Sequence, residues 1–386
     1  MKVLTVFGTR PEAIKMAPLV KALHRASEVE SIVCVTGQHQ EMLQQVLKLF
    51  AIEPEYHLSL MAPDQQLNGL ASRMLGALDS VFQYVQPERV LVHGDTTTAL
   101  VATLAAFHRK IPVGHVEAGL RSGNIAQPWP EEVNRRAVDI MSHQLFAPTE
   151  AARANLLAEN LGGAIYVTGN TVIDALRIAD MALRQDKDLR SEVDARLPPE
   201  QLGKKLLLVT GHRRENFGTG FANICTALQA LASFGDTHIV YPVHLNPNVQ
   251  KPVNTTLGDC RFIDLIAPLD YLGFVRMMQR ADCILTDSGG IQEEAPYLGK
   301  PVLVMRDVTE RPEAVSAKAV RLVGTDPARI VDGVRAVLGE HANWHMSATQ
   351  LYGDGFAAER IVDALLGRAT DHFVNHAVDS DKLLTA

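Results

Sequence analysis

Short apolar segments alternate with longer segments of mixed polarity along most of the chain. The apolar segments are rich in β-branched residues, which is typical of buried strands. They predict strands at residues 2–7, 31–36, 89–93, 113–116, 165–167, 205–209, 238–242, 281–286 and 302–305. The segments between them, such as 11–26 and 97–108, are amphipathic at helical spacing. This alternation predicts an α/β fold with parallel sheets, which bind ligands at the carboxyl ends of their strands.

The two halves of the chain resemble each other. The segments VLTVFGTRPE at 3–12 and LLLVTGHRRE at 206–215 each contain a buried strand, a glycine turn and a basic residue. The segments at 89–98 and 282–290 each end a strand in an aspartate followed by hydroxyl residues. Chance similarity is the alternative, because strand–glycine–helix turns are common in α/β proteins. We predict two Rossmann-like, doubly wound domains that face each other across a cleft.

A turn-forming cluster at 168–171 predicts the boundary between these domains. The first domain is expected to span 1–169 and the second 170–355. A C-terminal helix within about 356–386 is expected to join the first domain. The charged, proline-containing stretch 185–204 is expected to be a surface connection.

The composition excludes several classes of protein. Hydrophobic residues make up 47% of the 386 residues and charged residues 21%, an ordinary globular balance. The formal charge is −7, whereas nucleic-acid-binding proteins usually carry a basic excess. No segment approaches the roughly 20 apolar residues of a membrane span, and no secretory signal is recognisable. The four separated cysteines form no C-x-x-C pair. We therefore expect a cytoplasmic protein with no nucleic-acid or membrane partner.

A glycine-rich turn follows the predicted strand at 281–286. Ser288, Gly289 and Gly290 precede a predicted helix, whose free N–H groups would attract a phosphate. Glu293 and Glu294 are expected in the first turn of that helix, where they suit the helix dipole, and one of them could accept hydrogen bonds from a ribose. The same motif also fits a tight turn with a capping serine.

Basic residues stand at several predicted strand–helix junctions. They are Arg10, Lys15, Arg213, Arg214 and Arg311. Cations that converge on strand ends in an acidic protein suggest a diphosphate or another strongly anionic ligand. Each of them alone is typical of a solvated surface.

Two pairs with the pattern His-x-acid mark strand ends. His93 and Asp95 form one pair, and His115 and Glu117 form the other. Residues two apart point to the same side of a strand, so each pair is expected to project together. The pairs could also bind a divalent metal, but no H-E-x-x-H or similar spacing occurs. Packed, hydrogen-bonded histidines are the simpler interpretation of His93 and His115.

Further candidates for acid–base chemistry lie elsewhere. Glu131 and Arg135 are four residues apart and are expected to orient each other on one helix face. His212 lies at the glycine turn of the second half. Carboxylates with a histidine and several cations fit acid–base chemistry on a phosphorylated ligand. The sequence contains no G-x-G-x-x-G after a strand, no P-loop and no G-x-S-x-G elbow, so we predict no nicotinamide cofactor and no resident metal.

Together these segments resemble a known family, the bacterial non-hydrolysing UDP-N-acetylglucosamine 2-epimerases. The resemblance runs from residue 1 to about 367. It rests on the segments GTRPEAIKMAP, HGDTTT, HVEAGLRSG, PWPEEVNRR, TGNTVIDAL, TGHRREN, YPVHLNPNV, DSGGIQEEAPYLGKPVLVMRDVTERPEA and YGDG. It implies a glycosyltransferase-B-like fold and the interconversion of UDP-GlcNAc and UDP-ManNAc for surface polysaccharides.

The resemblance implies roles for residues in both halves. At the reacting sugar it places Asp95, Glu117, Glu131 and His212. For charge there and along the diphosphate it implies Arg10, Lys15, Arg135 and Arg311. Around the phosphates and the uridine it implies Ser288, Gly289, Gly290, Glu294, Phe274 and Leu269. Leu269 stands where a relative has glutamine, so only its backbone could make a polar contact to the base.

The chemistry of this substrate restricts the mechanism. The C2 proton of an N-acetylhexosamine is not acidic, and without a nicotinamide the sugar cannot be oxidised transiently at C3. Loss of UDP from C1 acidifies that proton, because positive charge develops on the ring. We expect a 2-acetamidoglucal intermediate, followed by re-addition of UDP and protonation on the other face. A carboxylate must remove the proton, and Asp95, Glu117 and Glu131 all remain candidates.

Other possibilities stay open at this point. The substrate could be a UDP-2,3-diacetamido uronic acid, or the chain could be a glycosyltransferase of the same fold or a nucleotide-sugar sensor. The three carboxylates favour the epimerase, because a transferase needs fewer. The resemblance also implies a homodimer and an activator site for a second UDP-GlcNAc, formed by Gln38, His39, Gln65 and His244.

Overall fold

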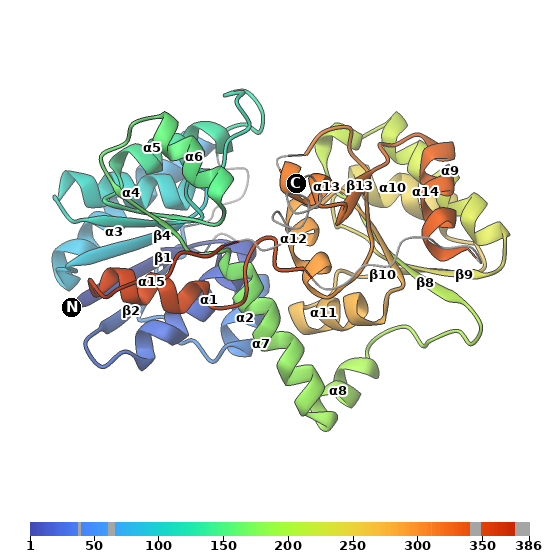
Figure 1. Ribbon diagram of the computed structural model, residues 1–386, viewed down its shortest axis with the longest axis horizontal. Coiled ribbons are helices and arrows are strands. Elements are labelled where there is room, and N and C mark those ends of the chain that lie inside the picture. The colour runs from blue at the N-terminus through green and yellow to red at the C-terminus, as the bar shows by residue number, and fades with distance from the viewer. Residues whose placement is uncertain (38–39, 61–65, 310, 340–348, 375–386) are drawn as a thin grey trace, which may run out of the picture. The chain divides into compact units, whose positions relative to one another are not determined.

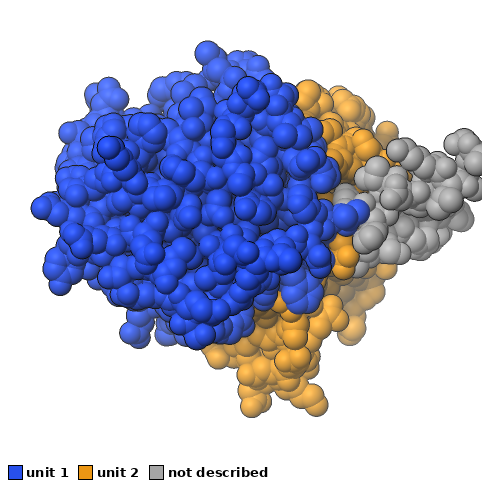
Figure 2. All heavy atoms as spheres, turned by 60° about the vertical axis from the view of Figure 1, so that its left-hand side comes forward, with its two compact units in different colours: residues 1–175, 352–375 blue, residues 176–351, 376–386 orange. Residues whose placement is uncertain are grey.

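The computed structural model describes the chain except for residues 38–39, 61–65, 310, 340–348 and 375–386. The described residues form two compact units, which are coloured separately in Figure 2. The first unit is Met1–Ala175 with the described part of 352–375, and the second is Leu176–Leu351. The chain passes from the first unit to the second inside a helix, α7, Thr171–Gln185.

The first unit is built on a seven-stranded parallel sheet (Figure 1). Its strands are β1 Lys2–Phe7, β2 Glu30–Val35, β3 Tyr56–His57, β4 Arg89–His93, β5 Val113–Val116, β6 Gln144–Ala147 and β7 Ala164–Val167. They are hydrogen-bonded in the order β3-β2-β1-β4-β5-β6-β7. Its helices are α1 Arg10–Arg25, α2 Gln40–Leu49, α3 Leu67–Val85, α4 Thr97–His108, α5 Glu131–Met141, α6 Glu150–Ala158 and α15 Ala357–Leu365. The last of these, α15, packs against α1.

The second unit repeats this plan with six parallel strands in the order β10-β9-β8-β11-β12-β13. Its strands are β8 Lys205–Thr210, β9 Thr237–Pro242, β10 Ile263–Ile266, β11 Cys283–Thr286, β12 Val302–Val304 and β13 Val320–Leu322. Its helices are α8 Lys187–Asp194, the short 3₁₀ helix η1 Arg214–Asn216, α9 Thr219–Ser233, α10 Pro247–Leu257, α11 Tyr271–Arg280, α12 Gly289–Tyr297, α13 Pro312–Ser316 and α14 Pro327–Leu338. The stretch predicted to be a surface connection therefore contains a helix, α8, which begins where the Asp186 side chain accepts from the Asp188 and Leu189 N–H groups.

Both sheets have the strand order of a doubly wound Rossmann fold, so the predicted fold class is confirmed for each unit. In each core, apolar strand residues pack against helices. Leu4, Val6 and Val90 meet Met74 and Leu78 of α3 in the first unit. In both units the chain adds strands first on one side of the first strand and then on the other, so that the order reverses between β1 and β4 and between β8 and β11. Ligands of such sheets bind at this switch point.

Among the described helices, none has the length and apolar character needed to cross a membrane.

Candidate active site

The turns after β1 and β4 form the switch point of the first unit. Thr9 caps α1, and the Glu12 side chain accepts from the N–H groups of Gly8 and Thr9 at 3.0 and 2.7 Å, which completes a capping box. Glu12 also accepts from the Thr96 hydroxyl in the β4–α4 turn at 2.6 Å. This buried carboxyl therefore ties the two turns together. Burial raises the pKa of Glu12.

Gly8 has no room for a side chain. A Cβ there would lie 2.2 Å from the Thr36 hydroxyl and 2.6 Å from that of Thr98. These two hydroxyls are hydrogen-bonded to each other at 3.0 Å in the interior. The glycine thus lets the first turn pack directly onto the ends of its neighbouring elements.

Glu117 follows the end of β5 and holds an unusual conformation. Its φ is +67°, which is rare for a residue with a long side chain and is commonly associated with functional sites. Its carboxylate is 9% exposed and forms an ion pair with Lys15. The Asn170 side-chain amide donates to the same oxygen, Oε2, at 2.8 Å. These donors favour the ionised form of the carboxyl.

His93 lies beside this carboxylate. Its Nε2 is 3.8 Å from Glu117 Oε2, beyond hydrogen-bond distance. Burial, helped by the nearby Lys15, lowers the pKa of His93 to about 3 despite the opposing effect of Glu117. The imidazole is therefore neutral at neutral pH and packs next to the carboxylate without an ion pair.

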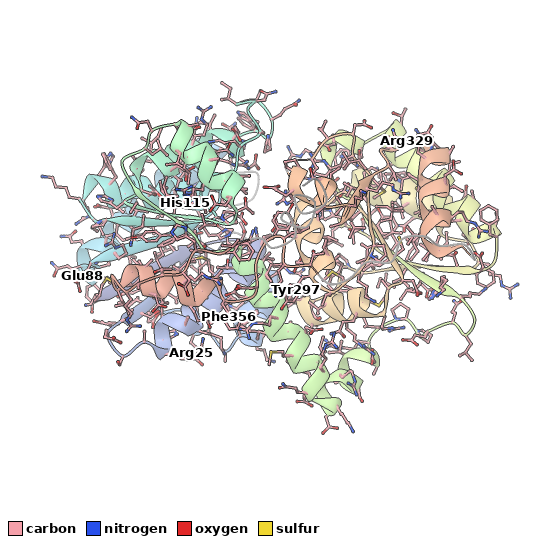
Figure 3. All side chains as sticks on the ribbon, in the orientation of Figure 1. Arg25, Glu88, His115, Tyr297, Arg329 and Phe356 are labelled. Carbon is pink, nitrogen blue, oxygen red and sulfur yellow. The ribbon has the colours of Figure 1, made fainter. Side chains whose placement is uncertain are left out.

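The spacing had predicted that His115 and Glu117 project together, but the structure separates them. Its Nδ1 lies 2.6 Å from Asp139 and its Nε2 lies 2.8 Å from the Gly94 carbonyl oxygen. Asp139 also pairs with Arg121 at 2.8 Å. Figure 3 shows His115 within the first unit, among the strands. The reason for the difference is that β5 ends at Val116, so the alternation of side chains does not extend to Glu117. His115 is a packed, hydrogen-bonded residue, as the simpler interpretation held.

Arg135 joins the turn after β4 to α5. It forms an ion pair with Asp95, and its Nη1 lies 3.3 Å from Glu132. The predicted pairing of Arg135 with Glu131 is wrong, because Glu132 occupies the buried face of α5 and Glu131 opens the helix beside it. Among the described residues Glu131 takes part in no ion pair, whereas Asp95 is held by Arg135. Arg10 is the first residue of α1, directly after the cap.

The switch point of the second unit is organised by a buried aspartate, Asp287. Its carboxylate accepts from the backbone N–H groups of His212 and Arg213 at 2.9 Å and from the Asn216 side chain at 3.2 Å. His212 Nδ1 lies 3.4 Å from the same carboxylate. Desolvation lowers the pKa of His212, while Asp287 opposes that shift. Asp287 therefore fixes the turn that presents His212.

The start of α12 fits the predicted phosphate cradle. Ser288 precedes the helix and makes no side-chain capping bond, unlike Thr9 in the first unit. Arg311 lies over Gly289, where an added Cβ would be 2.6 Å from its Nη1. Its Nε donates to Glu293 at 2.6 Å. A glycine backbone and a guanidinium thus approach each other at a helix N-terminus, where anions bind readily.

The acids of α12 lie beyond the first turn, contrary to the prediction, because the helix begins at Gly289. Glu293 is buried and pairs with Arg311. Glu294 is also buried and accepts from the Tyr271 hydroxyl at 3.2 Å. Phe274 is half-buried in the first turn of α11, and Leu269 lies in the loop before that helix. Neither acid is therefore placed to serve the helix dipole.

The predicted activator residues are only partly described. Gln38, His39 and Gln65 lie outside the described residues. His244 stacks on His212, with ring centroids 5.5 Å apart and planes at 22°.

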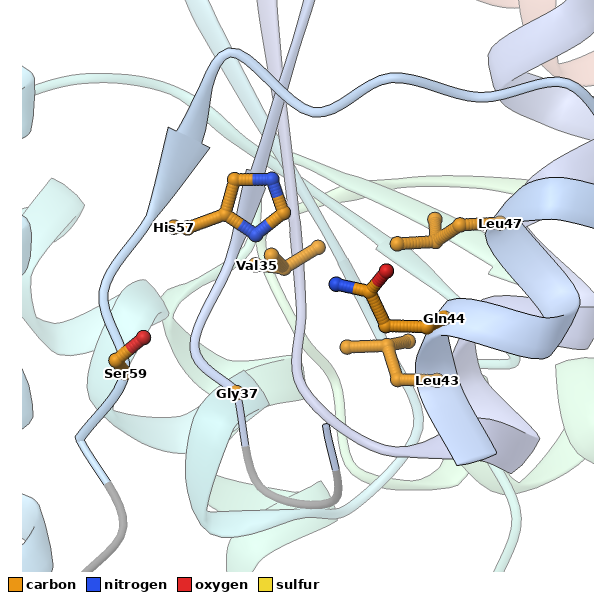
Figure 4. Close-up of a pocket in the computed structure, with 7 residues that line it drawn as sticks. All are labelled: Val35, Gly37, Leu43, Gln44, Leu47, His57 and Ser59. Carbon is orange, nitrogen blue, oxygen red and sulfur yellow. The ribbon is translucent and has the colours of Figure 1, made fainter. Parts of the chain in front are cut away.

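A cavity of about 290 Å³ lies in the first unit at the β2–β3 edge of the sheet, beside α2 (Figure 4). It is lined by Val35, Gly37, Leu43, Gln44, Leu47, His57 and Ser59.

Three residues that organise these sites were not singled out from the sequence: Asp139, Asn170 and Asp287. Asn170 and Asp287 belong to quoted segments, TGNTVIDAL and DSGG, and each directly follows a strand end or turn. That position could have marked them. Across the described residues, no three His, Cys, Asp or Glu side chains are grouped so that they could hold a metal ion.

The two Rossmann units, with charged residues at one switch point and a glycine-rich helix start at the other, define a nucleotide-binding α/β enzyme. The family model described as UDP-N-acetylglucosamine 2-epimerase matches residues 21–366. The chain belongs to this family of isomerases, as the motifs had indicated.

Relatives of known name are similar over almost the whole chain. A UDP-N-acetylglucosamine 2-epimerase of Escherichia coli (strain K12) is 57% identical over 370 residues, which cover 95% of this chain and 98% of that protein. The Neisseria meningitidis UDP-GlcNAc 2-epimerase, solved with UDP-GlcNAc, is 47% identical with a TM-score of 0.90, covering 95% of this chain and 100% of that one. S. aureus MnaA, solved with UDP, is 43% identical with a TM-score of 0.84, covering 97% and 99%.

Proposed function

We propose that this protein reversibly epimerises UDP-N-acetylglucosamine at C2 to UDP-N-acetylmannosamine. The observation that carries this proposal is the group of carboxylates paired with cations at the β1–β4 switch point in a chain 57% identical to a named epimerase. The product would supply the synthesis of surface polysaccharides.

The second unit would bind the uridine diphosphate. The N–H groups at the start of α12 and the Nη groups of Arg311 are suited to the phosphates, because Ser288 does not cap the helix with its side chain. Glu294, held by Tyr271, would accept hydrogen bonds from the ribose hydroxyls. Phe274 and the backbone at Leu269 would lie against the uracil.

The first unit would carry out the proton transfer. One carboxylate removes the C2 proton while the C1–O bond breaks, so that the electron pair of the C2–H bond forms the C1=C2 bond and UDP departs in an anti elimination. The intermediate is 2-acetamidoglucal. Re-addition of UDP at C1 with protonation of the other C2 face completes the reaction. Asp95 and Glu117 each form an ion pair with a cation, Arg135 and Lys15 respectively, which fits a positioned base. Glu131 remains a third candidate, and Arg10 and His212 would stabilise the departing diphosphate.

One assay tests this function. Purified protein is incubated with UDP-GlcNAc and EDTA, without an acceptor or added nicotinamide, and the products are followed by proton NMR. We expect UDP-ManNAc to accumulate until it reaches equilibrium with the substrate. Free ManNAc would instead indicate a hydrolysing enzyme. A spectrum that is unchanged both with EDTA and with an added divalent cation would overturn the proposal. Activity that EDTA abolishes and a divalent cation restores would overturn the metal-free mechanism.

We also propose a second UDP-GlcNAc site for activation, at Gln38, His39, Gln65 and His244. The stacking of His244 on His212 supports it, because a ligand that contacts one ring would act on the other. The site predicts that UDP-ManNAc alone is converted slowly and that a trace of UDP-GlcNAc accelerates the conversion. Equal rates of UDP-ManNAc conversion with and without the trace of UDP-GlcNAc would contradict the proposed activator site.

A homodimer and a cytoplasmic location complete the proposal. Phe107 of α4 and Val133 and Ile140 of α5 are 47% to 67% exposed on neighbouring helices, and exposed apolar groups of this kind commonly cover an interface. The four cysteines are free, which suits a reducing compartment. Light scattering that gives the mass of one chain would contradict the dimer.

A further inference from the structure

Asn170 lies at the point where the chain leaves the first unit, in the segment TGNTVIDAL. It follows β7 and directly precedes α7, and it is 3% exposed. Its backbone N–H donates to the Tyr352 carbonyl oxygen at 2.6 Å, so it also contacts the segment through which the chain returns.

The orientation of the Asn170 amide is fixed by its two hydrogen bonds. Its Oδ1 accepts from the Val172 N–H at 3.0 Å, in the first turn of α7. The other end of the amide is therefore the NH₂ group, and this group donates to Glu117 Oε2 at 2.8 Å. A flipped amide would face a backbone donor with an NH₂ group and the carboxylate with an oxygen, so it would lose both bonds.

The neighbours of the Glu117 carboxylate act on it in different ways. Glu117 lies beyond the end of β5 with φ +67°, between the Val116 carbonyl oxygen, which accepts from the Gly94 N–H, and the Ala118 N–H, which donates to the Phe146 carbonyl oxygen. Lys15 provides charge at Oε2 from a flexible side chain on α1. The neutral His93 is 3.8 Å away. Asn170 donates from a buried position, and its side chain has only two rotatable bonds.

We propose that Asn170 is a positioning residue for the epimerisation. It holds Oε2 of Glu117 in place and keeps the carboxyl ionised, so that the carboxylate is presented to the substrate in one orientation. This inference rests on the proposed function, in which Glu117 is one of the carboxylates that act at C2.

The substitution Asn170→Asp separates this role from a structural one. The new carboxylate would keep an oxygen where Val172 N–H needs an acceptor, so α7 would start as before. It would place a second negative charge beside Glu117 in exchange for the donor. Like charges at this distance raise a carboxyl pKa. We expect kcat at pH 7 to fall about tenfold or more and the acid limb of the kcat/KM profile to move up by about one pH unit or more.

Two further variants control the experiment. Asn170→Ser keeps a short acceptor for the helix start but cannot reach Glu117, so it should lower kcat without adding charge. Thr171→Val changes the next residue, which is equally buried and whose hydroxyl has no hydrogen-bond partner among the described residues. It should leave kcat and the pH profile at their wild-type values. Affinity for UDP, measured by calorimetry, should be unchanged in all three variants.

The outcomes distinguish the two proposals. Wild-type protein that does not convert UDP-GlcNAc would contradict the proposed function itself. Active wild type together with wild-type kcat and acid limb in Asn170→Asp would overturn the positioning role. Reduced kcat with an unmoved acid limb and a lowered melting temperature would make Asn170 merely structural, which also overturns it. If Asn170→Asp does not fold, a wild-type kcat in a folded Asn170→Ser would overturn the positioning role.

Discussion

At Glu117, Asp95 and Asp287, the surroundings of a single carboxylate determine what it can do. Glu117 and Asp95 each pair with a cation and keep some exposure, so a ligand can reach both carboxylates. Asp287 is fully buried and is occupied by the donors of the His212 turn. Under the proposed function, residues of the same chemical type thus divide between proton transfer and support because of burial and hydrogen bonding.

Charge-removing variants test the three candidate bases. Asp95→Asn, Glu117→Gln and Glu131→Gln keep the side-chain shape, and any residue that acts as the base should lose about 10²–10⁴-fold in kcat. UDP affinity should change little. Steady-state kinetics with UDP-GlcNAc provide the measurement, and a loss below about tenfold removes that residue from the list.

The same variants differ in their expected stability. Glu117→Gln removes the carboxylate that pairs with Lys15, and Asp95→Asn removes one of the two carboxylates that pair with Arg135. The free energy of unfolding should therefore fall by about 1–3 kcal/mol in each. Glu131→Gln breaks no ion pair between described residues and serves as the matched control, with an unchanged urea midpoint. A midpoint lowered equally in all three would contradict the ion pairs as the cause.

The first turns of two helices show how similar elements acquire different tasks. In α1 the side chains of Thr9 and Glu12 occupy the backbone donors of the turn. In α12 the residue before the helix makes no such bond, and glycines follow it. A capped helix start is a fixed structural joint, whereas an uncapped one can bind an anion. The first therefore positions the switch point and the second is suited to a phosphate.

Gly289→Ala tests the phosphate cradle at α12. A methyl group there would lie 2.6 Å from Arg311 Nη1, so the guanidinium would have to move although Glu293 holds it. We expect UDP to bind about tenfold or more weakly, measured by calorimetry. Gly290→Ala is the comparison, because its Cβ would meet only Glu294 Oε2 at 3.7 Å, an ordinary contact. Its loss of affinity should be the smaller one. The reverse order would contradict the placement of Arg311.

Glu12 makes the joint between the β1–α1 and β4–α4 turns sensitive to pH. Burial raises the pKa of Glu12 above its ordinary value of 4.5. The folded protein therefore binds this proton more tightly than the unfolded chain does. The resulting stabilisation is complete below about pH 4.5 and is lost as the pH rises through the folded-state pKa.

Glu12→Gln should remove that dependence, because an amide stays neutral and can still accept from the Gly8 and Thr9 N–H groups through its oxygen. Relative to wild type, the variant should gain stability as the pH rises from about 4.5 towards 8. Urea unfolding across this range measures the difference. A difference that stays constant with pH would show that Glu12 does not titrate in the folded state.

At the scale of the whole molecule, the proposed reaction predicts exchange at C2. Elimination removes the C2 proton, and re-addition delivers one from an exchangeable protein group. In D₂O the product should therefore carry deuterium at C2, as measured by mass spectrometry and proton NMR. His212→Asn should impair turnover and release 2-acetamidoglucal and UDP, because the imidazole that would hold the diphosphate is lost. Many turnovers without any C2 exchange would be incompatible with elimination and re-addition.

The sequence by itself predicted nine of the strands of this protein and the strand ends that carry its polar residues, whereas β3, β6, β10 and β13 were not predicted. Strand and helix periodicity is local, and turn motifs such as Gly8-Thr9 and Ser288-Gly289 lie beside the strands they follow. Asp95 and His212 could be placed after strand ends because each closely follows a predicted strand in the sequence. Family motifs added the activity, because their length exceeds what chance produces.

Only the tertiary structure decided which side chains meet. Asn170 reaches Glu117 across 53 residues and Arg135 reaches Asp95 across 40. Such pairs depend on strand order in the sheet and on the buried face of each helix. They also depend on where a strand stops, as the separation of His115 from Glu117 shows. A local pattern contains none of this information, because side-chain contacts between distant segments are selected by packing and desolvation over the whole unit.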